Sequence, residues 1–406
     1  MQLSLFDAVK DVYARADGPV SNEDLYRRVS MATGITMEEM DRTAPIGQSG
    51  KRTSPIKRAA RWAQQSLKAA GLLEKTPERG RWTLTKEGKT ELRKARPNAT
   101  LVAFSTDLGV GIWSLAQDVF SKIDEPITLA LTSPPYPLRT PRAYGNAGKT
   151  EKEYIEFVVE NLRPIAKNLV PGGAITLNVA NDIFESGVPS RSLYCERLVL
   201  AICDELNLSL MDRLVWVNPS KAPGPTQWAC KTRQQLKGAY EPIFYFTNDP
   251  KLARSNNRRV LQPHTERMQK LIASGGEKRG RVSSDNSHTV KPGSYSNATE
   301  GRIPTNVLTY SHTCKSQLDY KKAARAELFP AHGAPYPLQL AKFLIQFLSN
   351  RGDLVVDPFG GSMTTGVAAE ELDRRWICTE AMWEYAKGSA NRFPGAVMNE
   401  AFENAA

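Results

Sequence analysis

Short apolar runs that alternate with helical stretches constrain the fold of this 406-residue chain more than any other feature. Apolar runs of about four to eight residues are typical of buried strands, and apolar residues spaced by three and four are typical of helices. Their alternation predicts a mostly parallel sheet covered by helices on both faces, a doubly wound α/β fold. The predicted strands are residues 127–132, 174–180, 210–217, 242–247, 353–358 and 375–380.

Helical patterns fill the intervals between these strands. The first predicted helix ends at a Pro171-Gly172-Gly173 turn, because neither residue type favours a helix interior. Residues 251 to about 305 show almost no periodicity and predict a loop-rich segment. The predicted helices are residues 152–169, 192–206, 337–349, 363–372 and 383–391.

A small separate domain is predicted before the sheet. Helical spacing begins at Leu5, a capping pattern at Ser21 starts a second helix, and a third helix covers residues 54–70. A hairpin of residues 72–74 and 81–85 follows, and three helices followed by two strands are typical of a winged helix. The stretch AGLLEKTPERGRWTLTKEGK resembles the N-terminal domain of Mrr-type restriction proteins. A winged helix that contacts protein is the alternative to one that binds DNA.

Positive charge is concentrated in two segments outside the predicted sheet. The chain has 54 Lys and Arg against 43 Asp and Glu, a net charge of +11. Residues 51–96 hold 14 basic and 4 acidic residues, and residues 251–302 hold 11 and 4. Clustered cations bind nucleic acid by releasing its condensed counterions, which favours a polyphosphate partner. Two solvated, solubilising surfaces are the alternative interpretation.

Several classes of protein are disfavoured by the sequence. Five cysteines without a C-x-x-C pair support neither a zinc ribbon nor a disulfide framework, and the four histidines show no metal spacing, so no metal is proposed. No apolar run approaches the ~20 residues that cross a bilayer. Asp7 and Asp11 lie where a signal peptide would be apolar. We expect a protein of the reducing cytoplasm without a membrane segment.

A glycine-containing turn links the predicted strand 353–358 to the next helix. Its small residues let backbone N–H groups and the helix N-terminus approach a ligand. Glu380 ends the following strand, where a carboxylate can accept hydrogen bonds from both hydroxyls of a ribose. The turn has neither the lysine of an ATP-binding loop nor the spaced glycines of an NAD fingerprint. An adenosine-containing cofactor is therefore predicted, and a turn required only for packing is the alternative.

Ser133, Pro134, Pro135 and Tyr136 follow directly after the predicted strand 127–132. The two prolines remove two backbone donors and fix φ near about −65°, so the carbonyl groups of this loop are rigidly aimed. Acceptors beside an aromatic ring suit the binding of an exocyclic amino group while the ring stacks on its base. A polyproline-like surface turn is the alternative for the tetrapeptide alone.

Together the two motifs resemble those of the S-adenosylmethionine-dependent DNA amino-methyltransferases. Ser-Pro-Pro-Tyr resembles motif IV of that family, and Asp-Pro-Phe-Gly-Gly-Ser resembles its motif I. Motif IV precedes motif I, as in the circularly permuted beta class, which implies a Rossmann-like sheet. WVNPSKAPG with YEPIFYFTN looks like motif VIII, and HGAPYPLQLAKFLI looks like motif X. Met363 departs from the family pattern, which more often has Gly there, and Gly333 stands where Pro is usual.

The resemblance implies methylation of the N4 amine of a flipped cytosine in duplex DNA, because Ser at the first motif IV position usually accompanies N4-cytosine specificity. Ser133 Oγ and the Pro134 carbonyl would accept the amine protons, and Tyr136 would stack on the base. A restriction-modification system, with a cognate restriction endonuclease, is the implied context. An N6-adenine enzyme, an RNA amino-methyltransferase and an inactive DNA-binding regulator are the alternatives.

Four regions and two sets of binding residues follow from these expectations. The regions are a winged-helix DNA-binding domain (1–98), a catalytic part (99–250), a basic target-recognition segment (251–305) and a cofactor-binding part (306–406). The S-adenosyl-L-methionine site would comprise Asp357, Pro358, Phe359, Gly360, Gly361, Ser362, Thr364, Thr365, Glu380, His332 and Tyr336. The DNA contacts would be Lys57, Arg58, Arg61, Arg79, Arg81, Arg258, Arg259, Lys278, Arg279 and Arg281.

Overall fold

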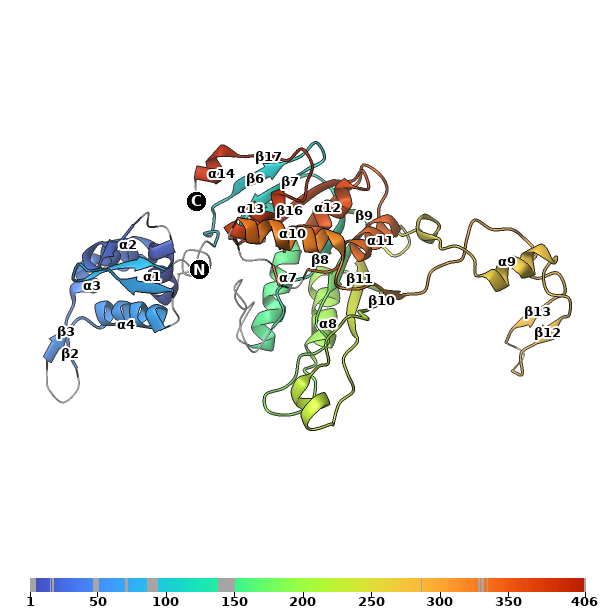
Figure 1. Cartoon of the computed structure of the whole chain (residues 1–406), viewed down its shortest axis with the longest axis horizontal. Coiled ribbons are helices and arrows are strands. Elements are labelled where there is room, and N and C mark those ends of the chain that lie inside the picture. The colour runs from blue at the N-terminus through green and yellow to red at the C-terminus, as the bar shows by residue number, and fades with distance from the viewer. Residues whose placement is uncertain are drawn as a thin grey trace.

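The computed structural model divides into an N-terminal domain, a body built on a large sheet, and an extended arm (Figure 1). The structure describes residues 5–404, except residues 15, 17, 47–50, 70–71, 86–93, 138–149, 286, 328, 330–331 and 334. The predicted doubly wound α/β class is confirmed by the body, and the predicted basic segment 251–305 contributes the arm.

Ten strands of the described chain form the sheet of the body, in the order β14-β10-β11-β9-β8-β15-β16-β7-β6-β17. The five central strands, from β9 to β7, are parallel, and antiparallel pairs lie toward both edges. The bounds are β6 Leu101–Ser105, β7 Gly109–Trp113, β8 Ile127–Thr132, β9 Leu169–Asn178, β10 Ser209–Val217, β11 Tyr240–Thr247, β14 Val307–Thr309, β15 Leu354–Asp357, β16 Arg375–Glu380 and β17 Val397–Met398.

The predicted strands 210–217 and 242–247 are present, but they pair with each other in antiparallel orientation. Their connection contains a single short π-helix, Thr226–Lys231, instead of the crossover helix that a parallel pair requires. The strands β6 and β7 were not predicted. They form an antiparallel pair in which Gly109 and Gly111 interrupt the apolar pattern.

Helices cover both faces of the sheet, because side chains of the central strands alternate between two hydrophobic clusters. Val355 of β15 contacts the cluster that contains residues of α11, α12 and α13, whereas Leu354 and Val356 contact the cluster of α7 and α8. None of the described helices is long and apolar enough to cross a membrane. The bounds are α6 Ala116–Phe120, α7 Glu151–Lys167, α8 Tyr194–Leu206, α10 Lys315–Ala326, α11 Leu338–Leu348, α12 Thr364–Glu370, α13 Trp383–Ala390 and α14 Glu400–Asn404.

The Pro171-Gly172-Gly173 segment is part of strand β9, so its prediction as a turn that ends the preceding helix was wrong. Helix α7 ends earlier, at Lys167. Gly172 has φ +74°, and a Cβ atom there would lie 1.8 Å from the carbonyl oxygen of Leu252. The glycine therefore permits the close approach of a chain segment that is distant in sequence.

The N-terminal domain contains the three predicted helices and the predicted hairpin, together with elements that were not predicted. Ser21 caps α2 by accepting a hydrogen bond from the backbone N–H of Asp24 (3.1 Å). Helix α3 and the β2–β3 hairpin lie between the second and third predicted helices. The bounds are α1 Leu5–Ala14, β1 Val20–Ser21, α2 Asn22–Thr33, α3 Met37–Asp41, β2 Ala44–Ile46, β3 Lys51–Thr53, α4 Pro55–Ala69, β4 Leu73–Lys75 and β5 Arg81–Leu84.

The arm extends away from the body and carries its own short elements (Figure 1). After a 3₁₀ turn at Asn257–Val260 come α9 (Glu266–Ala273) and the hairpin of β12 (Arg281–Val282) and β13 (Thr289–Val290). The sequence interpretation treated the whole polar segment as a loop and overlooked helix α9, although Met268, Leu271 and Ile272 have helical spacing. None of the residues of α9 is buried.

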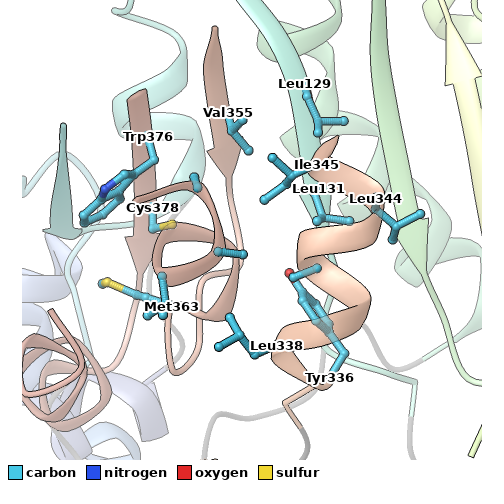
Figure 2. Packing of buried hydrophobic residues seen from close by; sticks show 14 of the residues in the cluster. Leu129, Leu131, Tyr336, Leu338, Leu344, Ile345, Val355, Met363, Trp376 and Cys378 are labelled. Atoms are coloured by element: carbon cyan, nitrogen blue, oxygen red, sulfur yellow. The ribbon is translucent and has the colours of Figure 1, made fainter. Parts of the chain in front are cut away.

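Met363 stands where the resemblance of the glycine turn led us to expect glycine, and its backbone conformation is one that favours glycine. Its φ is +52°, in the left-handed region that favours glycine, yet its side chain is fully buried. It belongs to the cluster that includes Trp376 and Cys378 (Figure 2). A Cβ atom at Gly111 would lie 2.5 Å from the Phe104 ring and 2.9 Å from the Met363 sulfur, so the glycine in β7 makes room for both side chains.

Candidate active site

The two sequence motifs meet at the carboxyl ends of adjacent parallel strands. β15, which leads into the glycine turn, lies between β8, which leads into Ser133, and β16, which ends at Glu380. Val355 pairs with Leu129 across β15 and β8, so segments more than 200 residues apart share one edge of the sheet. Ligands of open α/β sheets bind at this edge.

The carboxylate of Asp357 is buried and is hydrogen bonded from several elements. It accepts bonds from the hydroxyls of Thr132 (2.5 Å), Thr365 (2.6 Å) and Tyr336 (3.3 Å) and from the Phe359 N–H (3.0 Å). Burial raises the pKa of Asp357, against the effect of these donors. The predicted cofactor residues Asp357, Tyr336 and Thr365 thus lie together, with their polar atoms directed at one another.

The glycine turn itself is fixed to β16 through backbone groups. The Gly360 N–H donates to the Thr379 carbonyl (2.8 Å), and the Thr379 hydroxyl donates to the Pro358 carbonyl (2.8 Å). Phe359 lies between Pro358 and Gly360 in the sequence, and the centroid of its ring is 5.5 Å from that of Phe157 on α7. This arrangement holds the turn at the edge of the sheet.

Glu380 lies beside the second glycine of the turn. Its two carboxylate oxygens accept hydrogen bonds from the N–H groups of Gly361 (2.8 Å) and Met382 (2.7 Å), and burial raises its pKa to about 7. Gly361 has φ +54°, and a Cβ atom there would lie 3.0 Å from Nε2 of His332. The structure therefore brings Glu380, Gly361 and His332, three of the predicted cofactor residues, close to one another.

Ser362 and Thr364 take part in a buried network around Arg392, which the sequence analysis missed. Arg392 donates to the Ser362 carbonyl (2.5 Å) and to the Thr364 hydroxyl (2.9 Å), which also accepts from Gln317 (3.1 Å). Burial lowers the pKa of Arg392 to about 10. No local pattern marks this arginine, because it contacts the turn only in the folded chain.

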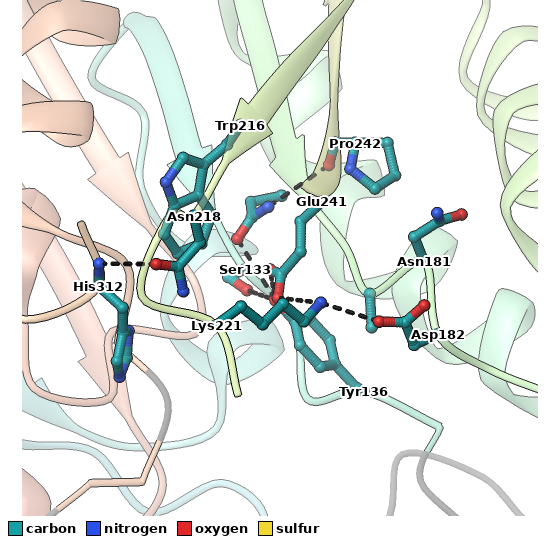
Figure 3. A network of polar contacts seen from close by, with 12 residues as sticks. Ser133, Tyr136, Asn181, Asp182, Trp216, Asn218, Lys221, Glu241, Pro242 and His312 are labelled. Carbon is teal, nitrogen blue, oxygen red and sulfur yellow. Dashed lines mark hydrogen bonds and ion pairs between the residues drawn. The ribbon is translucent and has the colours of Figure 1, made fainter. Parts of the chain in front are cut away.

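Tyr136 lies at the centre of a polar network at the carboxyl end of β8 (Figure 3). Its hydroxyl oxygen is 3.2 Å from Ser133 Oγ, 3.0 Å from Glu241 Oε2 and 3.3 Å from Asn178 Oδ1. Burial, together with the nearby Glu241 charge, raises the pKa of Tyr136 well above its usual value. Among the described residues, none donates a hydrogen bond to the Pro134 carbonyl.

Glu241, Asn178, Asp182 and Lys221 are polar residues of this network that the sequence analysis did not single out. Lys221 donates to Asp182 (2.9 Å) and lies 3.8 Å from Glu241 Oε1. Asn178 ends β9, and Glu241 lies near the start of its antiparallel neighbour β11, so both are at the edge that carries Ser133. A polar residue at a strand end is the signal that could have found them.

The predicted DNA-contacting residues of the N-terminal domain are not equally available. Arg58, Arg61 and Arg79 are exposed. Lys57 forms an ion pair with Asp41 and lies over the Tyr26 ring, and Arg81 pairs with Glu78 at 3.0 Å.

In the arm, one of the predicted DNA contacts is engaged in hydrogen bonds within the protein. Arg259 donates to the Ser349 carbonyl at the end of α11 and to the Arg254 carbonyl, so it attaches the arm to the body. The remaining four predicted contacts are exposed, namely Arg258, Lys278, Arg279 and Arg281. No cluster of three or more metal-binding side chains occurs in the described part of the chain.

Each of the two parts of this architecture, the sheet body and the N-terminal domain, is similar to a known protein family. Residues 127–392 match the N6/N4 DNA methylase family model, and residues 4–94 match the Mrr N-terminal domain. The chain is 34% identical over 270 residues to the type II methyltransferase M.PvuII of Proteus hauseri. The aligned residues make up 66% of this chain and 79% of that protein. The type II methyltransferase M.BglII of Bacillus subtilis is 23% identical over 263 residues, 64% of this chain and 62% of that protein.

A solved structure has a similar fold. The PvuII DNA methyltransferase, described as cytosine-N4-specific, matches with a TM-score of 0.57 and 28% identity over 75% of this chain and 93% of that chain.

Asp357→Asn tests the buried network in the absence of any ligand. An amide group in this place must direct its NH₂ toward a hydrogen-bond donor, so we expect a loss of about 1–3 kcal/mol in stability. Thermal unfolding followed by circular dichroism measures it. Asp373→Asn is the matched control, because Asp373 is an exposed carboxylate in an ion pair with the exposed Arg351, and its replacement should change stability by less than about 0.5 kcal/mol. Equal midpoints for both variants would contradict a structural role of the Asp357 network.

Proposed function

This chain belongs to the DNA methylase family, and from that premise we propose that it methylates the exocyclic N4 amine of cytosine in duplex DNA. The observation that carries the proposal is the Ser133-to-Tyr136 loop, which lies at the same sheet edge as the glycine turn. The cytosine-N4 specificity in the name of the PvuII enzyme supports the choice of base. N6-adenine methylation is the alternative product.

The methyl donor of a DNA methylase is S-adenosyl-L-methionine, and the glycine turn fits its adenosine part. Each oxygen of Glu380 accepts one backbone hydrogen bond, which leaves lone pairs that can accept the two ribose hydroxyls. Gly361 has no side chain to obstruct the approach. We assign the cofactor contacts to Glu380, His332 and the backbone of Pro358 to Gly361. Asp357, Tyr336, Ser362, Thr364 and Thr365 hold the turn in place through the two buried networks.

The chain's own residues position the amine. The bound cofactor supplies an electrophilic methyl group. We assign the Ser133 hydroxyl and the Pro134 carbonyl as acceptors for the two amine protons, so that the nitrogen lone pair becomes more localised and nucleophilic. Tyr136 stacks on the cytosine after it is flipped from the duplex, because N4 inside a base pair is hydrogen bonded to guanine. Positioning and exclusion of water account for most of the acceleration in this scheme.

Duplex DNA contacts two basic regions in this proposal. The arm reads the target through Arg258, Lys278, Arg279 and Arg281, and the N-terminal domain binds phosphates through Arg58, Arg61 and Arg79. The names of the type II methyltransferase relatives support a role in a restriction-modification system. We propose that the protein acts in the bacterial cytoplasm and that a cognate restriction endonuclease is its partner.

Base-resolution sequencing of DNA from cells that express the chain tests the reaction. We expect N4-methylcytosine at one sequence context, and Ser133→Ala should lower the modified fraction at least ~10-fold, because its hydrogen bond strengthens as the nitrogen becomes tetrahedral. The purified variant should bind the cofactor like the wild type. Detection of N6-methyladenine without N4-methylcytosine would overturn the assigned base.

Cofactor affinity should depend on pH through Glu380. Its pKa of about 7 means that half of the carboxyl groups are protonated near neutrality. Ribose hydroxyls donate to the ionised form, so binding favours deprotonation, and affinity should rise about tenfold between pH 6 and pH 8. Calorimetric titration of the wild type and Glu380→Gln measures this. The variant should bind more weakly and without this pH dependence; an identical pH dependence in both proteins would remove Glu380 from the site.

The N-terminal domain should supply phosphate contacts. Replacement of Arg58, Arg61 and Arg79 by Ala should weaken DNA binding and flatten the fall of log K with log salt by about 0.9 for each lost contact. Fluorescence anisotropy over a salt series measures the slope. Arg27→Ala is the control in the same domain, because Arg27 is paired with Asp24. A triple variant with the wild-type slope would instead favour a domain that contacts protein.

A further inference from the structure

Glu241 has no role in the reaction as proposed, yet it is connected to Ser133 through a chain of hydroxyl groups. Ser133 Oγ is 3.2 Å from Tyr136 Oη, and Tyr136 Oη is 3.0 Å from Glu241 Oε2 (Figure 3). Methylation of an amine releases a proton. The Glu241 carboxylate and the Ser133 hydroxyl lie at opposite ends of this series of hydrogen bonds.

The direction of each hydrogen bond follows from the chemistry of the groups. Tyr136 has one hydroxyl proton, and an ionised carboxylate is a stronger acceptor than the Asn178 amide oxygen 3.3 Å away. Tyr136 therefore donates to Glu241, and Ser133 donates to Tyr136. Ser133 is left with its lone pairs available, which is the state required to accept a proton from the amine.

The surroundings of Glu241 make it a stronger base than an exposed glutamate. Its side chain is 20% exposed, and burial raises its pKa. Lys221, 3.8 Å away, opposes this shift, whereas the negative charge of Asp182 adds to it. Asp182 is held by Lys221 and by Arg191, each at 2.9 Å. Tyr136 remains protonated because its pKa lies well above the usual value.

We propose that Glu241 positions Ser133 through Tyr136 and is the final acceptor of the proton lost by the amine. As the N–CH₃ bond forms, the S–CH₃ bond of the methyl donor breaks and its electron pair remains on sulfur. The nitrogen releases one proton to Ser133 Oγ, Ser133 passes its own proton to Tyr136 Oη, and Tyr136 passes its proton to Glu241. The carboxylate becomes a neutral acid, and both hydroxyls are restored. This inference rests on the proposed amino-methyltransferase activity.

A double-mutant cycle in single-turnover reactions at saturating cofactor and DNA tests the relay. Glu241→Gln and Tyr136→Phe should each reduce the methyl-transfer rate by about 10- to 100-fold, and the double variant should be no slower than the slower single variant. Glu241→Asp should recover part of the rate. Glu185→Gln is the control, because Glu185 is an exposed carboxylate that bonds to Ser190 and should leave the rate unchanged.

The pH profile of the same rate separates the relay from a purely structural role. The wild-type rate should rise with pH as Glu241 ionises, and saturating cofactor removes the contribution of Glu380. This rise should disappear in Glu241→Gln. In Lys221→Met it should move to higher pH, because loss of the nearby cation raises the pKa of Glu241 further.

Three measurements define failure of the relay. Independent, multiplicative effects of the two single variants, or a wild-type pH profile in Glu241→Gln, would overturn it.

Cofactor titration and DNA anisotropy verify that the variants fold. Tyr136→Phe removes only one oxygen atom, so this variant tests the relay if Glu241→Gln does not fold. The wild-type product decides the proposed function independently, because N4-methylcytosine with a normal Glu241→Gln rate would refute the relay alone.

Discussion

The buried carboxylate of Asp357 is the interaction on which the site depends. It binds Thr132 at the end of β8, Thr365 at the start of α12 and Tyr336 before α11, in addition to the backbone of its own turn. A buried charge is stable only when such donors surround it. The same contacts therefore fix the glycine turn and the start of the Ser133 loop relative to one another.

Strand order converts two distant motifs into one site. Because β15 lies between β8 and β16, the glycine turn has the Ser133 loop on one side and Glu380 on the other. The antiparallel strand β11 adds Glu241 to the same edge from beyond β9. The proposed DNA contacts lie outside this core, in the arm and the N-terminal domain, where exposed cations could meet phosphate without disturbing the buried networks.

Regular periodicity allowed most elements of the body to be predicted. Residues 127–132 and 375–380 form strands with the predicted bounds, because each contains a short stretch of mostly apolar residues. The glycines of β7 concealed that strand. The short apolar pattern of α9 was overlooked because the segments on either side of it are polar. Gly172 was interpreted as the end of a helix. In the structure it has φ +74°, and its missing side chain leaves room for the backbone of Leu252, a contact that local sequence does not reveal.

The sequence by itself determined the fold class, the two motifs and the chemistry that their residue types permit. Only the tertiary structure decided which polar atoms pair. Thr132 lies 225 residues from Asp357, and Tyr136 lies 105 residues from Glu241. Hydrophobic periodicity is set by residues that are neighbours along the chain. These hydrogen bonds instead join residues from different strands, so they form only if the ends of those strands lie close together. That distance is set by the order of strands in the sheet, which no local pattern records.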